Sequence, residues 1–170
     1  MTATWRLREL RASDAEGMRT IFNHYVEHSL AAYAQRPLSM DEIRNLLAKC
    51  HGYPALAAED EKGNLVGFGF LSAYSPYDTF AGTALITYFI ASGHTGRGLG
   101  TAFLQELETQ AREHGVCRLL AHVSSKNEGS LAFHRTHGFH ECGCFHDIGC
   151  KQGELFDVEW FEKSLVDSIR

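Results

Sequence analysis

A glycine-rich stretch in the middle of the chain constrains the fold more than any other feature. Residues 96–100 read Gly-Arg-Gly-Leu-Gly and join an apolar run, 83–91, to a segment with helical periodicity, 98–114. The run is apolar on both faces, which is typical of a strand in the middle of a covered sheet. The helical segment places Leu99, Phe103, Leu107 and Ala111 on one face. The sequence therefore predicts a central strand, a tight turn and an amphipathic helix.

The rest of the chain predicts further helices and strands of an α/β fold. Ser13 with Glu16, and Ser39 with Glu42, form capping-box patterns that predict the starts of two helices. Their order with the other segments is β-α-α-β-β-β-α-β-α-β-β, which indicates a single domain over residues 1–170. The remaining predicted elements are strands at 4–10, 54–59, 65–73 and 116–124, a short helix at 127–137, and strand-like pieces near 139–147 and 154–162.

The composition favours one globular domain that handles a small molecule. The 170 residues are 44% hydrophobic and carry a formal net charge of −5. The basic residues are scattered, which argues against a nucleic-acid partner or an anionic membrane surface. We find no signal-peptide pattern at the N-terminus and no stretch near the ~20 apolar residues of a membrane span. The five cysteines include no Cys-x-x-Cys pair, so we expect reduced thiols and a cytoplasmic location.

The turn at 96–100 suits a phosphate group. Glycines let the backbone turn sharply, and the free N–H groups and positive dipole end of the following helix face the turn. The stretch lacks the Lys-Ser/Thr ending of a P-loop and the spacing to a ribose-binding acid that a dinucleotide site has. On these residues alone, a phosphate site and a purely structural glycine turn both remain open.

Two motifs together make the chain resemble the GNAT superfamily of N-acetyltransferases. The family's loop usually reads Gln/Arg-x-x-Gly-x-Gly/Ala, and residues 95–100 match it except that Thr95 stands in the first place. That change leaves the backbone that binds pyrophosphate in the family. The resemblance implies a single-domain GNAT fold, with a mixed central sheet flanked by helices, and acetyl-CoA as cosubstrate. The second motif is matched by Asn127, Ser130, Phe133, His134, Gly138 and Phe139.

Within that superfamily the chain is most similar to the phosphinothricin and methionine sulfoximine acetyltransferase group, over nearly its whole length. This similarity implies transfer of an acetyl group to the primary amine of a small molecule, such as an amino acid or an analogue, within a ternary complex. It also implies a homodimer. The residues that carry it are 21–29, His134, Gly149, Lys151, Gly153, Asp157 and Val158.

The resemblance also assigns roles to residues. An alkylammonium with a pKa near ~10 must lose a proton before it attacks a thioester. His134 matches the group's functional histidine at the CoA sulfur, so proton transfer is assigned to it. Asn127 is expected to hold the pantetheine arm or an ordered water, and it also suits a helix N-cap. The implied cofactor-binding residues are Tyr88, Phe89, Ile90, Thr95, Gly96, Arg97, Gly98, Leu99, Gly100, Thr101, Asn127 and Ser130.

Two positions depart from the group. Leu85 stands where related enzymes carry a Glu, which leaves His134, Glu27 and water chains as candidates for the base. Tyr77 stands where they carry an Arg, and a phenol does not replace both the hydrogen bonds and the charge with which Arg holds an anion. The residues expected to form the acceptor pocket are Glu27, Tyr33, Tyr74, Tyr77 and Phe80. For the four aromatic residues among them, ordinary packing is the alternative interpretation.

Two other interpretations remain open on the residues. A CoA-binding module that has lost catalysis fits Leu85 and Thr95, and it would bind acetyl-CoA without acceptor-dependent release of CoA. A structural zinc site is the other alternative, although the spacings match none of the usual zinc motifs, and we assign no metal ligand. The residues that raise it are His134, His137, His140, Cys142, Cys144, His146 and Cys150.

Overall fold

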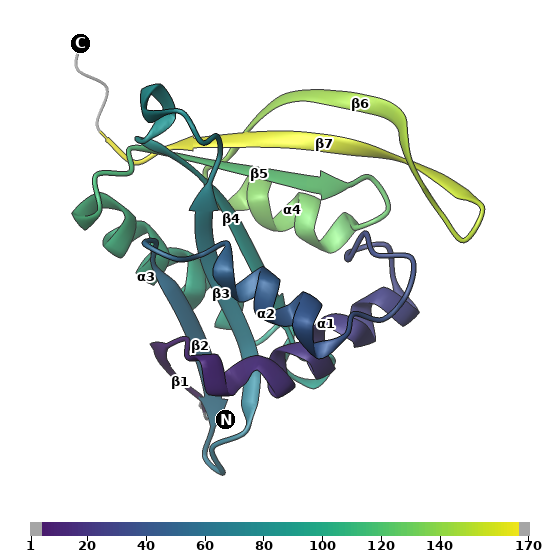
Figure 1. Ribbon diagram of the computed structural model, residues 1–170. Helices are drawn as coiled ribbons and strands as arrows, with labels where there is room; N and C mark the ends of the chain where they lie inside the picture. Colours follow the sequence, from purple (N-terminus) through teal and green to yellow (C-terminus); the bar gives the residue numbers. More distant parts are fainter. Residues whose placement is uncertain (1–4, 167–170) are drawn as a thin grey trace.

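The computed structural model describes residues 5–166, which are built around one seven-stranded sheet (Figure 1). The strand order is β1-β2-β3-β4-β5-β7-β6, so the apolar run at 83–90 lies in the middle, as predicted. Neighbouring strands are antiparallel except β4 and β5, which are parallel. The strands are β1 (Trp5–Glu9), β2 (Ala55–Asp60), β3 (Leu65–Ala73), β4 (Thr83–Ile90), β5 (Arg118–Ser124), β6 (His140–Lys151) and β7 (Glu154–Ser164).

Helices cover both faces of the sheet (Figure 1). One buried cluster joins Met18 and Ile43, from the first two helices, to Phe68 and Phe70 of β3, and a second lies under the third and fourth helices. The predicted order of helices and strands is confirmed. The helices are α1 (Ala15–His28), α2 (Met40–Ala48), α3 (Leu99–Glu113) and α4 (Glu128–Thr136), with 3-10 turns at Ala12–Asp14, Asp78–Phe80 and Ser92–His94.

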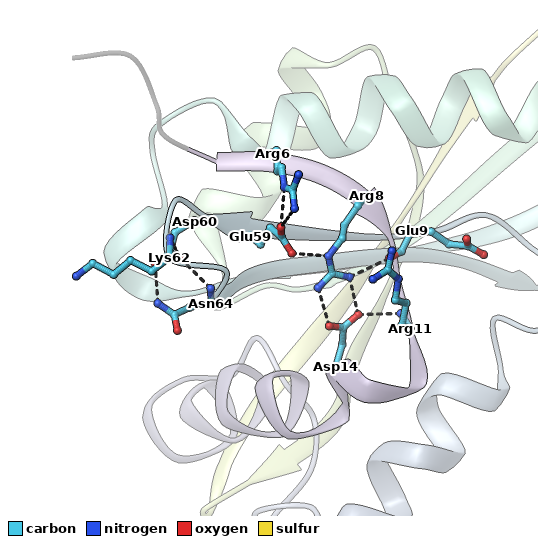
Figure 2. Close-up of polar contacts among 9 residues, drawn as sticks. All are labelled: Arg6, Arg8, Glu9, Arg11, Asp14, Glu59, Asp60, Lys62 and Asn64. Carbon is cyan, nitrogen blue, oxygen red and sulfur yellow. Dashed lines mark hydrogen bonds and ion pairs between the residues drawn. The ribbon is translucent and has the colours of Figure 1, made fainter.

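The start of α1 differs from the prediction. Asp14 precedes the helix, and the expected pairing of Ser13 with Glu16 is wrong. The Asp14 carboxylate accepts hydrogen bonds of 2.8 Å from both Nη atoms of Arg8 and from the N–H of Arg11 (Figure 2). Burial raises the pKa of Asp14, but these hydrogen bonds outweigh it and hold the pKa below its ordinary value. A 3-10 turn fixed by an ion pair therefore starts this helix.

The same arginine connects β1 to β2. Arg8 Nε donates to Glu59 Oε2 at 2.5 Å, and Arg6 pairs with the other oxygen of that carboxylate (Figure 2). Hydrogen bonds from Arg8 and Arg6 lower the pKa of Glu59. These ion pairs link the first strand to the sheet and to the start of α1.

Two local predictions near α2 and β3 are confirmed. Ser39 Oγ accepts from the Glu42 N–H at 3.3 Å and the Glu42 carboxylate accepts from the Ser39 N–H at 2.8 Å, which is the expected capping box. β2 and β3 form the predicted hairpin, and Asp60 Oδ1 accepts from the N–H groups of Lys62 and Asn64 in its turn (Figure 2). Short-range signals of this kind need no tertiary contact.

Helix α3 packs closely on the centre of the sheet. Its predicted face is confirmed, since Leu99, Phe103, Leu107 and Ala111 are each at most 1% exposed. Gly67 of β3 lets the helix approach, because a Cβ there would lie 3.0 Å from the Phe103 ring. Close packing fixes the start of α3, and with it the glycine turn, against β4.

The two parallel strands separate soon after they meet. β4 pairs with β3 from Ala84 to Ile90, whereas it pairs with β5 only from Thr83 to Leu85. Beyond Leu85 and its partner Leu120, the two strands diverge. The sheet therefore opens on one edge of β4 at 86–90, next to the strand's junction with the glycine turn.

The C-terminal hairpin is longer than predicted. β6 and β7 cover 140–151 and 154–164, whereas the sequence indicated strands near 139–147 and 154–162. The hairpin extends past the helices (Figure 1). Most of β6 is exposed, so its hydrophobic pattern gave a weak signal. Within residues 5–166, no helix is both long enough and apolar enough to cross a bilayer.

Candidate active site

A cavity of about 1180 Å³ lies where β4 and β5 diverge. It is lined by the glycine turn, by residues 85–90 of β4, by residues 121–124 of β5, by the first half of α4 and by residues 29–34 between α1 and α2. A volume of this size is larger than most small-ligand pockets, which are about 300–1,000 Å³, and suits one extended ligand together with a second small one.

The glycine turn forms one part of the lining. Gly96 and Gly98 have φ angles of +69° and +83°, and Gly98 is the N-cap of α3. A Cβ at either position would meet no atom of residues 5–166 within 4 Å, so open space lies above the turn in the described structure. The first N–H groups of a 15-residue helix face this space and have no partner within the helix. The arrangement suits an anionic group such as pyrophosphate.

The open edge of β4 supplies further main-chain donors. The Ala91 N–H donates to Val66 O, which fixes the alternation of hydrogen-bonded pairs between β3 and β4. By that alternation the peptide groups of Thr87 and Phe89 point to β3, and those of Tyr88 and Ile90 point to the gap. The Ile90 carbonyl accepts from Tyr25 Oη at 2.5 Å. The Tyr88 N–H is therefore placed to donate to a ligand in the cavity.

His134 lies on the face of the sheet that α3 and α4 cover, with both ring nitrogens engaged. Its Nδ1 is 2.7 Å from the Ser130 carbonyl, which can only accept, so Nδ1 carries a proton. Its Nε2 is 2.5 Å from Tyr88 Oη, whose O–H then donates to the neutral ring. The imidazole is 3% exposed, and burial lowers its pKa, while burial raises that of Tyr88. The two side chains form a hydrogen-bonded pair.

Asn127 has the predicted cap role. Its Oδ1 accepts from the Ser130 N–H at 3.2 Å at the start of α4. The amide nitrogen of the same side chain is left for another partner in the cavity that Asn127 lines. A cap and a ligand contact are thus compatible.

The opposite face of the sheet contributes a second set of side chains. Leu85, Thr87 and His122 line the cavity there, together with Tyr33 from the connection between α1 and α2. Tyr33 Oη is 3.3 Å from His122 Nδ1, and the two rings stack with centroids 5.6 Å apart. Phe156 stacks on Tyr33. This wall is aromatic, with one imidazole.

A buried lysine holds the connection that carries Tyr33. Lys151 of β6 is 1% exposed, and its Nζ donates at 2.8 Å to the carbonyls of Ser29 and Ala32. Burial lowers its pKa. The ammonium fastens residues 29–32, just after α1, to the C-terminal hairpin and so positions one wall of the cavity.

The structure brings most of the predicted cofactor residues together. Arg97 is exposed and Leu99 is buried in the core, so neither side chain lines the cavity. Leu99 packs inward because it starts the apolar face of α3. The predicted cofactor residues in the lining are Tyr88, Phe89, Ile90, Thr95, Gly96, Gly98, Gly100, Thr101, Asn127 and Ser130.

Four of the five predicted acceptor residues are not brought to the cavity. Glu27 follows the buried Val26 on α1 and points to solvent. Tyr74 and Phe80 pack against each other, and Tyr77 is 71% exposed in the same connection before β4. Position 77 therefore neither provides nor blocks an anion contact in the lining, whereas Tyr33 lies where it was predicted.

Two contributions to the lining were missed from the sequence. His122 interrupts an apolar run in β5, and its only signal was a polar residue among Leu119, Leu120, Ala121 and Val123. Tyr88 was predicted as a cofactor-binding residue, but the contact of its phenol with His134 was not predicted. Both depend on which strand edges separate, which local patterns do not show.

The possible metal ligands of the last third are only partly gathered. Among residues 5–166, Cys144, His146 and Asp157 offer ligand atoms within 4.8 Å of one another on the exposed hairpin. His146 Nδ1 is 3.1 Å from Asp157 Oδ2, a distance that a hydrogen bond explains by itself. The other candidates, including His134, stand outside this group.

Comparison with known proteins identifies a family of acetyltransferases and individual relatives that are named as acetyltransferases. The model of the acetyltransferase (GNAT) family matches residues 15–139. An L-methionine sulfoximine/L-methionine sulfone acetyltransferase of Pseudomonas aeruginosa is 28% identical over 162 residues, 94% of each chain.

Solved structures agree with this similarity. A phosphinothricin acetyltransferase of Sinorhizobium meliloti, in complex with acetyl-CoA, superposes with a TM-score of 0.89 at 26% identity, over 95% of this chain and 89% of that one. A ribosomal-protein-alanine N-acetyltransferase of Brucella melitensis gives 0.86 at 30% identity, over 94% and 99%. All three relatives are named as acetyltransferases, and their names give different acceptors.

Proposed function

Because this chain belongs to the acetyltransferase (GNAT) family, we propose that it transfers the acetyl group of acetyl-CoA to the primary amine of an amino acid or an amino-acid analogue. The amine attacks the thioester directly in a ternary complex. The observation that carries the proposal is one cavity lined by a glycine turn at a helix N-terminus, by the open edge of β4 and by two imidazoles. The named activities of the relatives support the acceptor class.

The residues present fit acetyl-CoA, which supplies an activated acetyl thioester. Open space above Gly96 and Gly98 and the N–H groups of α3 suit its pyrophosphate. Asn127 and Ser130 are assigned to the pantetheine arm. The Tyr88 N–H is assigned to the thioester carbonyl, where a fixed donor stabilises negative charge that develops on oxygen during attack.

His134 and Tyr88 are assigned to the leaving thiolate. Once the ring has taken up a proton from water, Nε2–H donates to the phenol oxygen, and the phenol proton is free to turn toward the sulfur. The thiolate gains one proton and the pair returns to its neutral form. This keeps the proton-transfer role of His134 and adds the phenol as the group through which it acts.

The experiment is release of free CoA from acetyl-CoA with methionine sulfoximine, methionine sulfone, phosphinothricin and a peptide with N-terminal alanine. We expect release that depends on one of the free amino acids and that falls at least about tenfold in His134→Ala. Preference for the peptide would move the acceptor to a protein N-terminus. Binding of acetyl-CoA without release by any amine would favour the catalytically impaired module.

We further propose a homodimer of a single-domain chain in the cytoplasm. Phe145, Ile148 and Leu155 are more than half exposed on the β6–β7 hairpin, and a second copy would cover this apolar surface. The five cysteines are free, which suits a reducing compartment. The net charge of −5 supports a small-molecule acceptor over nucleic acid or anionic membrane. Sedimentation of the wild type and of Phe145→Ser tests the dimer.

A further inference from the structure

The reaction needs a base to deprotonate the acceptor, and the described lining of the cavity contains no carboxylate. An alkylammonium has no lone pair, so some group must take its proton before attack. Among the described residues that line the cavity there is no Asp and no Glu. The imidazoles in the lining are His122 and His134, and these are the side chains there that titrate near neutrality.

His134 has no free lone pair for this task. Its Nδ1–H is bound to the Ser130 carbonyl, and its Nε2 already accepts from the Tyr88 O–H. The ring also lies on the face of the sheet that α3 and α4 cover, packed edge-on against Phe139 and stacked near Phe161. An incoming amine would have to displace a 2.5 Å hydrogen bond in a nearly closed site.

His122 stands on the other face, next to the open edge of β4. Leu85 and Leu120 are partners in register, so Thr87 and His122 follow two residues on, where the strands have parted. Side chains two residues apart on a strand share a face. The imidazole therefore lies on the same face as Leu85 and Thr87, and all three line the cavity.

Aromatic neighbours hold the ring. The Tyr33 ring stacks on the imidazole with ring centroids 5.6 Å apart, and the centroid of the Trp160 ring, on β7, lies 5.0 Å from that of the imidazole. Tyr33 Oη and His122 Nδ1 lie 3.3 Å apart. In the tautomer that carries its proton on Nδ1, this N–H donates to the phenol oxygen and Nε2 keeps a lone pair. No side chain or main-chain group among residues 5–166 bonds that Nε2. The ring is thus oriented through one nitrogen and free at the other.

We propose that His122 is the base that removes the proton from the acceptor ammonium, with Tyr33 as its positioning residue. The assignment rests on the proposed function. The proton passes from nitrogen to Nε2, and the freed lone pair forms a bond to the carbonyl carbon of the thioester. The carbon–sulfur bond breaks, the thiolate leaves with its electron pair, and the proton on His122 is released to water.

The ionisation of the site agrees with this role. The His122 side chain is exposed to the cavity, and partial desolvation by the groups around it lowers its pKa, which favours the neutral ring. Burial raises the pKa of Tyr33 to about 12, so the phenol does not titrate in the same range. On β7, Glu162 flanks Trp160 on this face and is bound to Arg118 at 2.7 Å.

The experiment compares wild type, His122→Gln, Tyr33→Phe and His51→Gln as an exposed control, with the best acceptor of the amino-acid panel. We expect kcat in His122→Gln to fall at least about 100-fold and the acidic limb of the pH profile to disappear. Acetyl-CoA affinity is expected to stay within about twofold, which shows that the variant is folded. The kcat of Tyr33→Phe is expected to fall less than that of His122→Gln. In a further variant, His122→Gly, added imidazole is expected to restore part of the rate.

The outcomes separate two failures. If the wild type turns over and His122→Gln has the same kcat and pH profile as the wild type, the assignment of His122 as the base is wrong. The proposed function is then unaffected. The same holds if His122→Gln loses rate only through acceptor KM. A wild type that releases no CoA with any amine would overturn the proposed function, and with it the base.

Discussion

Replacing Gly98 with alanine separates backbone strain from damage to the phosphate site. Gly98 has a φ of +83° at the start of α3, and Gly115 has a φ of +76° just past its end. At either place, a new Cβ would meet no atom of the described residues within 4 Å. Each change therefore costs only the left-handed conformation, about 1 kcal/mol. Both variants are expected to lower Tm by about 2–4 °C in thermal unfolding.

Affinity for acetyl-CoA is expected to distinguish the two variants. The methyl group of Gly98→Ala enters the open space that we assign to the pyrophosphate, whereas Gly115 lies outside the cavity lining. In isothermal titration calorimetry we expect Kd to rise at least about tenfold, or about 1.4 kcal/mol, for Gly98→Ala and to stay unchanged for Gly115→Ala. Equal Kd values for variants with equal Tm would refute the reasoning about the turn.

Three more predictions concern the walls of the cavity. Tyr88→Phe removes the O–H that reaches His134 and should lower kcat without changing the Kd of acetyl-CoA, as measured by steady-state kinetics and calorimetry. The folded pKa of His134 lies below 6.5, so the unfolded chain binds the extra proton, and the free energy of unfolding should fall as pH drops below about 6.5. Urea unfolding should show a shallower fall of this free energy in His134→Gln than in the wild type. Lys151→Met leaves the carbonyls of residues 29–32 without their donor, so it should cost about 2 kcal/mol in urea unfolding and raise acceptor KM.

Local signals in the sequence were sufficient for most of the fold. The Ser39–Glu42 capping box and the apolar face of α3 depend on contacts within a few residues, and both are confirmed. Ser13 with Glu16 has the same pattern and failed, because Arg8, on a neighbouring strand, binds Asp14. An ion pair between residues six apart, one on β1 and one in the turn before α1, decided that helix start.

The site was predictable where it depends on the chain's own order. The glycine turn and the Asn127 cap follow their strands directly, so their positions could be inferred. The pairing of Tyr88 with His134 and the place of His122 could not, because they depend on where β4 and β5 separate. The exposed positions of Tyr74 and Tyr77 likewise follow from how their connection folds back on itself.

Acetyl transfer to a primary amine is the central claim, and its most direct test is mass spectrometry of the acceptor. The wild-type protein is incubated with acetyl-CoA and each member of the amino-acid panel, and the products are identified. We predict an N-acetylated product from at least one free amino acid or analogue, and none from the same compound with its amine blocked. Binding of acetyl-CoA with no acetylated product from any amine would contradict the account.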